Sequence, residues 1–173
     1  QVTTAIFEGL YQYDYLATPT RLLPSTATAL PQITDNGLTW TVHVKPGIFF
    51  TDDPVFGGKR RELTAADYVY SLKRWLDPNL HRGGEAVITG LVVGARAVVD
   101  AARKPGAHFD YAAPMAGLRA LDRYTLQLKL NEAVYPPVEF FLTLGACAQE
   151  VVEAAGRDIG GRPVGTGPYM LKD

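Results

Sequence analysis

Strict alternation of apolar and polar residues from Leu38 to Lys45 constrains the fold of this chain more than any other feature. Leu38, Trp40, Val42 and Val44 are apolar, and the residues between them are polar. Successive side chains of a β-strand point to opposite faces of its sheet. The pattern therefore predicts a strand with one buried and one solvent-facing side.

Turn-forming residues stand on both sides of this strand. Asp35-Asn36-Gly37 precedes it, and Lys45-Pro46-Gly47 suits a type II turn after it. Ile48–Phe50 is expected to return as a further strand. Pro31 is expected at the sheet edge, where a missing N–H group does no harm. Residues 30–51 are thus predicted to form an antiparallel meander.

The best-defined predicted helix runs from Thr64 to Leu76. Thr64 is expected to be its N-cap, with Asp67 near the amide of the third helical position and Leu63 packed on Tyr68 as a hydrophobic staple. The apolar residues of this segment recur at helical spacing and form one continuous face. We expect that face to cover one side of the sheet.

Hydrophobic period and turn residues predict the remaining elements. The predicted elements are a strand with an aromatic face through residues 7–15, a loop over 80–90, a helix over 92–102, a hairpin formed by 117–121 and 124–130, and short helices after Pro136-Pro137 and over 149–155. The predicted fold class is α+β, with a largely antiparallel sheet that carries helices.

Composition limits the partners of the chain. Its 173 residues suit one domain. With 17 basic and 18 acidic residues and a net charge of −1, no overall field attracts nucleic acid or an anionic membrane surface. No apolar run approaches the roughly 20 residues that span a bilayer.

No catalytic, cofactor-binding or metal-binding residue is predicted from the residue patterns. The three histidines lack a metal-ligand spacing, and Cys147, the single cysteine, is expected to be a small buried residue. Asp52-Asp53 and Glu62 could form an acid and base pair, but the turn residues around them favour turn-forming acids. Gly57–Arg61 lacks the Ser or Thr of a phosphate-binding loop and is expected to be a solvated basic loop.

The Gly165-Thr166-Gly167-Pro168-Tyr169 segment predicts a chain crossing into a sheet. Its glycines and proline suit an irregular backbone that leads into an extended one, and Tyr169–Leu171 is apolar. The sequence stops at Asp173, shortly after this point. We therefore expect the chain to be a piece of a larger protein.

Five segments, taken together and in order, point to a known family more specifically than any one of them does alone. The segments are Phe7–Tyr11, Asp35–Gly47, Leu63–Arg74, Ala120–Leu126 and Pro163–Tyr169. They resemble successive segments of the family 5 extracellular solute-binding proteins, which include the oligopeptide- and dipeptide-binding components of ABC importers. The chain departs from this family in a longer loop between Phe50 and Leu63, and in a loose match between Asn79 and Gly117.

The resemblance implies a periplasmic-binding-protein-like fold of two lobes that close on a ligand. Residues 1–173 would be one domain, the small subdomain of the first lobe, and residues 1–20 and 163–173 would be arms that enter the main lobe. By similarity, Leu144-Gly145-Ala146 is the expected cleft-facing edge, because small residues let a ligand approach the backbone.

The resemblance also implies a function. The parent would be a monomeric, non-enzymatic receptor in the periplasm or outside the cell, and an anchor through a missing N-terminal segment stays open. It would capture peptides or similar small solutes and deliver them to an ABC permease. The alternatives are a non-peptide solute, such as haem, a nickel chelate, a glycan or glutathione, a hydrolase that uses Cys147, or a protein-interaction module.

Overall fold

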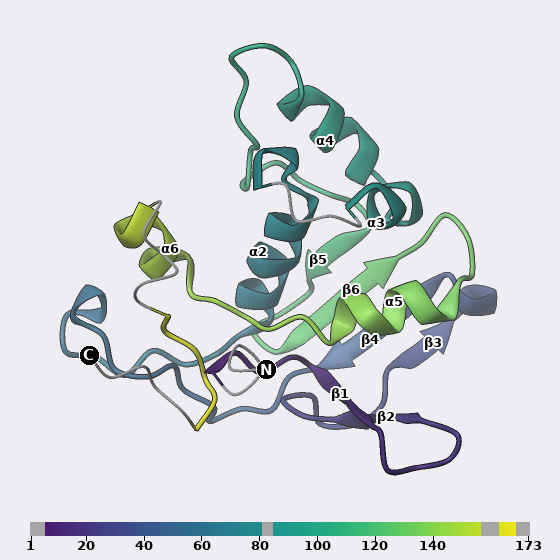
Figure 1. Ribbon diagram of the computed structural model, residues 1–173, viewed down its shortest axis with the longest axis horizontal. Helices are drawn as coiled ribbons and strands as arrows, with labels where there is room; N and C mark the ends of the chain where they lie inside the picture. The colour runs from purple at the N-terminus through teal and green to yellow at the C-terminus, as the bar shows by residue number, and fades with distance from the viewer. Residues whose placement is uncertain (1–5, 81–84, 157–162, 169–173) are drawn as a thin grey trace.

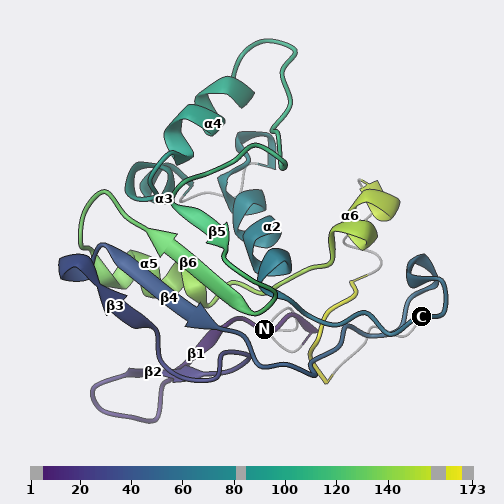
Figure 2. The same ribbon diagram turned by 180° about the vertical axis from the view of Figure 1, so that it is seen from behind.

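The larger sheet is built around the strand predicted from the alternating residues. In this computed structural model, which describes residues 6–80, 85–156 and 163–168, β4 (Thr39–His43) pairs on one side with β3 (Gln32–Thr34) and on the other with β6 (Thr125–Lys129). β5 (Leu118–Ala120) follows at the far edge, so the order is β3-β4-β6-β5 and every pairing is antiparallel. Figure 2 shows this sheet from its open face.

The buried side of the sheet follows the predicted period. Trp40 lies opposite Leu128 and Val42 opposite Leu126, and all four side chains are at most 1% exposed. Pairing these side chains across two strands removes them from water on the same face. The predicted strand and the predicted hairpin at 117–130 are therefore both confirmed, as is the edge position of Pro31 beside β3.

The prediction of a third strand in the meander is wrong. Ile48–Phe50 does not pair with β4, because β6 occupies that side of the strand. Phe49 forms only an isolated bridge with Glu62, and the amide of Phe50 donates to the carbonyl of Arg61. The turn at Gly47, with φ of 79°, forms as expected, but the chain after it leaves the sheet.

Helix α2 (Ala65–Leu76) covers the buried face of the sheet, as predicted, and packs on β5 and β6 (Figure 1). Its start is held by Asp67, whose Oδ2 accepts hydrogen bonds of 2.8 Å from both the amide and the hydroxyl of Thr64. Leu63 and Tyr68 are both fully buried in the hydrophobic core, as the predicted staple requires.

Two further helices follow α2 in the chain, and one of them replaces a predicted loop. α3 (Glu85–Leu91) overlaps residues 80–90, for which the glycines and charges predict a loop. Its Ile88 and Leu91 are buried, and this burial offsets the weak helix propensity of Gly90. α4 (Ala95–Ala102) confirms the next predicted helix but starts later, because Gly94 adopts the left-handed φ of 80°.

The remaining elements are a second hairpin, short helices and short 3-10 turns. β1 (Tyr11–Asp14) and β2 (Arg21–Pro24) form a separate antiparallel hairpin, so the predicted aromatic strand is shorter than expected and excludes Phe7. α5 (Tyr135–Leu142) and α6 (Gln149–Ala155) confirm both predicted short helices. Short 3-10 turns occur at Asp35–Gly37, Pro54–Phe56 and Pro78–Leu80. No described helix has the length and apolar character to cross a bilayer.

The segment at Gly165 lies beside the beginning of the described chain. The amide of Gly167 donates to the carbonyl of Ile6, and the carbonyl of Gly165 accepts from the amide of Thr51, both at 2.9 Å. A Cβ at Gly165 would overlap the Ile6 carbonyl, so glycine is needed for this contact. The strand expected over Tyr169–Leu171 lies outside the described residues.

The antiparallel sheets with flanking helices confirm the predicted α+β class.

Candidate functional site

The predicted cleft edge, Leu144-Gly145-Ala146, is the connection between α5 and α6. Leu144 is half-buried and Ala146 is fully buried. Gly145 forms an antiparallel bridge with Gly9, and the amide of Ala146 donates to the carbonyl of Glu8 at 3.3 Å. The backbone of this segment is thus paired with residues 8–9.

Glycine is required at both members of this bridge. A Cβ on Gly145 would lie 2.5 Å from the Cβ of Phe7, and a Cβ on Gly9 would overlap the carbonyl of Thr143. Real Cβ atoms do not approach other atoms this closely. The close approach that was attributed to a ligand is therefore made by the chain's own residue 7, and the role of Leu144-Gly145-Ala146 in a cleft stays a prediction.

Leu144 also lines an apolar hollow between α2, α3 and α5. The hollow has a volume of about 160 Å³, and its lining residues are all apolar: Trp75, Val87, Ile88, Pro137, Phe140, Phe141 and Leu144. The rings of Trp75 and Phe140 meet edge to face with centroids 6.1 Å apart. Such a surface can hold an apolar group, but it has no side chain that transfers protons. Sequence reasoning missed it, because its walls come from three separate helices.

Asp53 and Glu62, two of the carboxylates that could form an acid and base pair, have structural partners. Asp53 Oδ1 accepts the amide of Val55 at the start of the Pro54–Phe56 turn. Glu62 accepts hydrogen bonds from the Arg123 guanidinium, the Gly47 amide and the Tyr124 hydroxyl. These donors, Arg123 first, lower the pKa of Glu62 to about 2. The prediction of a turn-forming role is thus supported for Asp53, whereas Glu62 joins segments that are far apart in the sequence.

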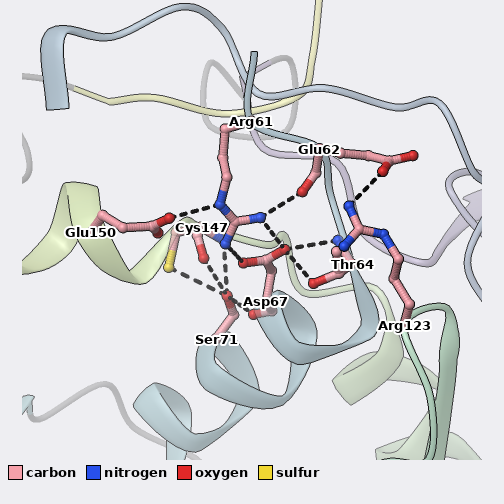
Figure 3. Close-up of polar contacts among 8 residues, drawn as sticks. All are labelled: Arg61, Glu62, Thr64, Asp67, Ser71, Arg123, Cys147 and Glu150. Carbon is pink, nitrogen blue, oxygen red and sulfur yellow. Dashed lines mark hydrogen bonds and ion pairs between the residues drawn. The ribbon is translucent and has the colours of Figure 1, made fainter. Parts of the chain in front are cut away.

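A polar cluster at the start of α2 brings together residues far apart in the sequence (Figure 3). Arg61 donates to Asp67 Oδ1 at 2.6 Å, to Asp67 Oδ2 at 3.1 Å and to Glu150 Oε1 at 2.7 Å. Burial disfavours the guanidinium charge, but the bonds to Asp67 and Glu150 outweigh it, and the pKa of Arg61 is raised. Residue patterns had placed Arg61 only in a solvated loop, and no local signal links it to Glu150.

Cys147 lies at the edge of the same cluster. Its amide donates to Ser71 Oγ at 2.8 Å, and its Sγ lies 3.3 Å from that oxygen. A serine hydroxyl is neutral and is not the base that activates a thiol. The Nδ1 atom of His43 lies 3.1 Å from Thr125 Oγ1, its neighbour on the sheet. Among the described residues, no group of three or more His, Cys, Asp or Glu side chains is arranged to hold a metal ion.

The family assignment follows from comparison with known proteins. The sequence profile of the "Bacterial extracellular solute-binding proteins, family 5 Middle" matches residues 21–173. The chain belongs to this family.

Curated peptide-binding proteins align with almost the whole chain. It is 25% identical over 179 residues to Di/tripeptide-binding protein 1 of Pseudomonas aeruginosa, covering 96% of this chain and 29% of that protein. It is 27% identical over 188 residues to the periplasmic oligopeptide-binding protein OppA of Escherichia coli, covering 99% of this chain and 29% of that protein. The chain thus spans less than a third of the length of these relatives.

A solved structure shares the fold. Listeria monocytogenes OppA bound to peptide superposes on 99% of this chain with a TM-score of 0.75 and 22% sequence identity, and the match covers 31% of that protein. At this identity the likeness establishes the fold alone, which is that of one part of the Listeria protein.

Proposed function

We propose that this chain is part of a substrate-binding protein of an ABC importer, which captures peptides outside the cytoplasmic membrane and delivers them to the permease. The observation that carries the proposal is the family 5 match over residues 21–173. The names of the aligned relatives, a di/tripeptide-binding protein and an oligopeptide-binding protein, point to peptides as the solute class. The parent would act in the periplasm or outside the cell, as a monomer without catalytic activity.

Within that parent, this chain would form one wall of the ligand cleft and limit the size of the ligand. Residues 1–20 and 163–173 would lead into the main lobe; the hydrogen bond between Gly167 and Ile6, which holds the two segments together, supports this division. Leu144-Gly145-Ala146 would face the cleft. The apolar hollow beside Leu144 supports this placement, because an apolar surface next to a paired backbone edge suits a peptide side chain.

A thermal-shift screen on the full-length parent tests the proposed solute class. A ligand that binds only the folded protein stabilises it by RT ln(1 + [L]/Kd), which is about 2.7 kcal/mol at a hundredfold excess over Kd. We expect mixed di- to nonapeptides to raise the unfolding midpoint. Haem, a nickel chelate, glycans and glutathione are the comparison set. A shift with one of these and none with any peptide pool contradicts peptide capture.

The hydrolase alternative has its own test. If Cys147 were a nucleophile, Cys147→Ala would abolish turnover of a bound peptide. We expect the full-length wild type and Cys147→Ala proteins to return every bound peptide intact, as measured by mass spectrometry of the released ligand. Cleavage by the wild type that is lost in Cys147→Ala contradicts the non-enzymatic assignment.

A further inference from the structure

The segment Leu144–Cys147 is held from two sides. On one side, Gly145 and Ala146 pair with residues 8–9, and Phe7 packs on Gly145. On the other side, the amide of Cys147 bonds Ser71 of α2, and Glu150 in the first turn of α6 bonds Arg61, which precedes α2. The second side uses polar side chains whose geometry can be followed atom by atom in Figure 3.

Arg61 is the centre of that polar contact. Asp67 is 3% exposed and is itself fixed by the Thr64 hydrogen bonds at the start of α2. Because both carboxylate oxygens of Asp67 accept hydrogen bonds from Arg61, the guanidinium is held in one orientation, with its Nε directed at Glu150. Bidentate charge-assisted bonds fix direction as well as distance. Glu150, in the first turn of α6, thus docks on a donor that is already in place.

Ser71 supplies the second anchor, one helical turn beyond Asp67. Its hydroxyl donates to the carbonyl of Asp67 at 2.7 Å and accepts the amide of Cys147 at 2.8 Å. Asp67, which holds Arg61, and Ser71 therefore lie on one face of α2. Through Arg61 and Ser71, positions 150 and 147 are held on either side of the start of α6. Burial alone would disfavour a charged Glu150, but the Arg61 hydrogen bond reverses this and lowers its pKa.

We propose that Arg61 and Glu150 are positioning residues for the Leu144–Cys147 edge, and that their ion pair keeps this edge in the conformation that receives the solute. The solute half of this proposal rests on the proposed function. An edge that is already ordered loses less conformational freedom when a ligand binds, so an intact pair favours affinity without contacting the ligand. Neither residue was assigned a role by the residue patterns.

Hydrogen exchange in the full-length protein tests the positioning itself. The variant is Glu150→Ala, which leaves Arg61 bound to buried Asp67. The matched control is Glu153→Ala on the same helix, where an exposed glutamate bonds only Gln149 among the interactions described. We expect the amides of Ala146 and Cys147 to exchange about two- to fivefold faster in Glu150→Ala than in Glu153→Ala, the range of a partly exposed ion pair. Glu150→Gln, which keeps an oxygen acceptor, should fall between them.

Peptide affinity of the same variants tests the consequence. We expect Kd for a peptide identified in the screen to rise by a similar factor in Glu150→Ala, and to stay at the wild-type value in Glu153→Ala. Equal exchange at residues 146–147 in the two variants overturns the proposal, as does faster exchange with an unchanged Kd. A wild type that binds no peptide at all overturns the proposed function instead, and the exchange data then still decide whether the pair holds the edge.

Discussion

Replacing Gly145 with alanine separates two reasons for a small residue at the predicted cleft edge. If the space is needed by a ligand, the unliganded protein should tolerate the new methyl group. The structure gives the opposite expectation, because the Cβ would lie 2.5 Å from the Phe7 Cβ and 3.0 Å from the Phe7 carbonyl carbon and oxygen. We therefore expect Gly145→Ala to destabilise the protein before any ligand is added.

The magnitude follows from how firmly the neighbours are held. Phe7 cannot simply retreat, because the next carbonyl, that of Glu8, accepts bonds from the Ala146 amide and the Tyr68 hydroxyl. Forcing one extra carbon into such a packed contact costs about 1–3 kcal/mol.

Thermal and urea unfolding of the unliganded full-length protein measure this loss. Gly90→Ala in α3 is the matched control, since its new Cβ would meet nothing closer than Arg96 at 3.6 Å. Alanine is the better helix former, so the control should be stabilised by up to about 1 kcal/mol. A Gly145→Ala protein as stable as wild type refutes the reasoning, and a loss of peptide affinity at unchanged stability would return Gly145 to the role of ligand spacer.

Three further substitutions test the cluster, the hollow and the pH response. Asp67→Ala removes the partner of Arg61 and the cap of α2, and it should lower the free energy of unfolding, measured in urea, by about 2–4 kcal/mol. The control is Asp100→Ala, which breaks an exposed ion pair with Arg103 and should change this free energy by less than about 1 kcal/mol. Leu144→Asp places a carboxylate in the apolar hollow and should weaken peptide binding about tenfold or more by titration calorimetry, while exposed Leu121→Asp should not. The pKa of Glu62 is about 2 in the folded protein against an ordinary 4.5, so its stabilising effect is complete above pH 4.5 and is lost as the pH falls towards 2. Glu62→Gln should therefore make the free energy of unfolding fall less steeply with pH in this window. An unchanged slope contradicts this role of Glu62.

Local sequence patterns predicted local structure well. The alternation at 38–45 gave β4, and Thr64 with Asp67 gave the start of α2, because both signals depend on residues a few positions apart. The pairing of β4 with β6 joins residues more than 80 positions apart, so local patterns wrongly favoured the nearer Ile48–Phe50 as the partner of β4. At α3, the glycines were visible in the sequence, but the burial of Ile88 and Leu91 that overrides them was not.

In the candidate site, too, local patterns are visible in the sequence and long-range contacts are not. The resemblance directed attention to Leu144-Gly145-Ala146, and small residues there are explained by the contact with Phe7, across 138 positions of sequence. The Arg61–Glu150 pair spans 89 positions and had no local signature. The walls of the hollow come from α2, α3 and α5, so only the packing of these helices reveals it.

Isothermal titration calorimetry of the full-length parent with the peptides that shift its unfolding tests the central claim most directly. The account predicts saturable binding of one peptide per protein monomer, with a negative heat-capacity change from apolar burial. Saturable binding of a non-peptide solute, with no heat from any peptide, would contradict it.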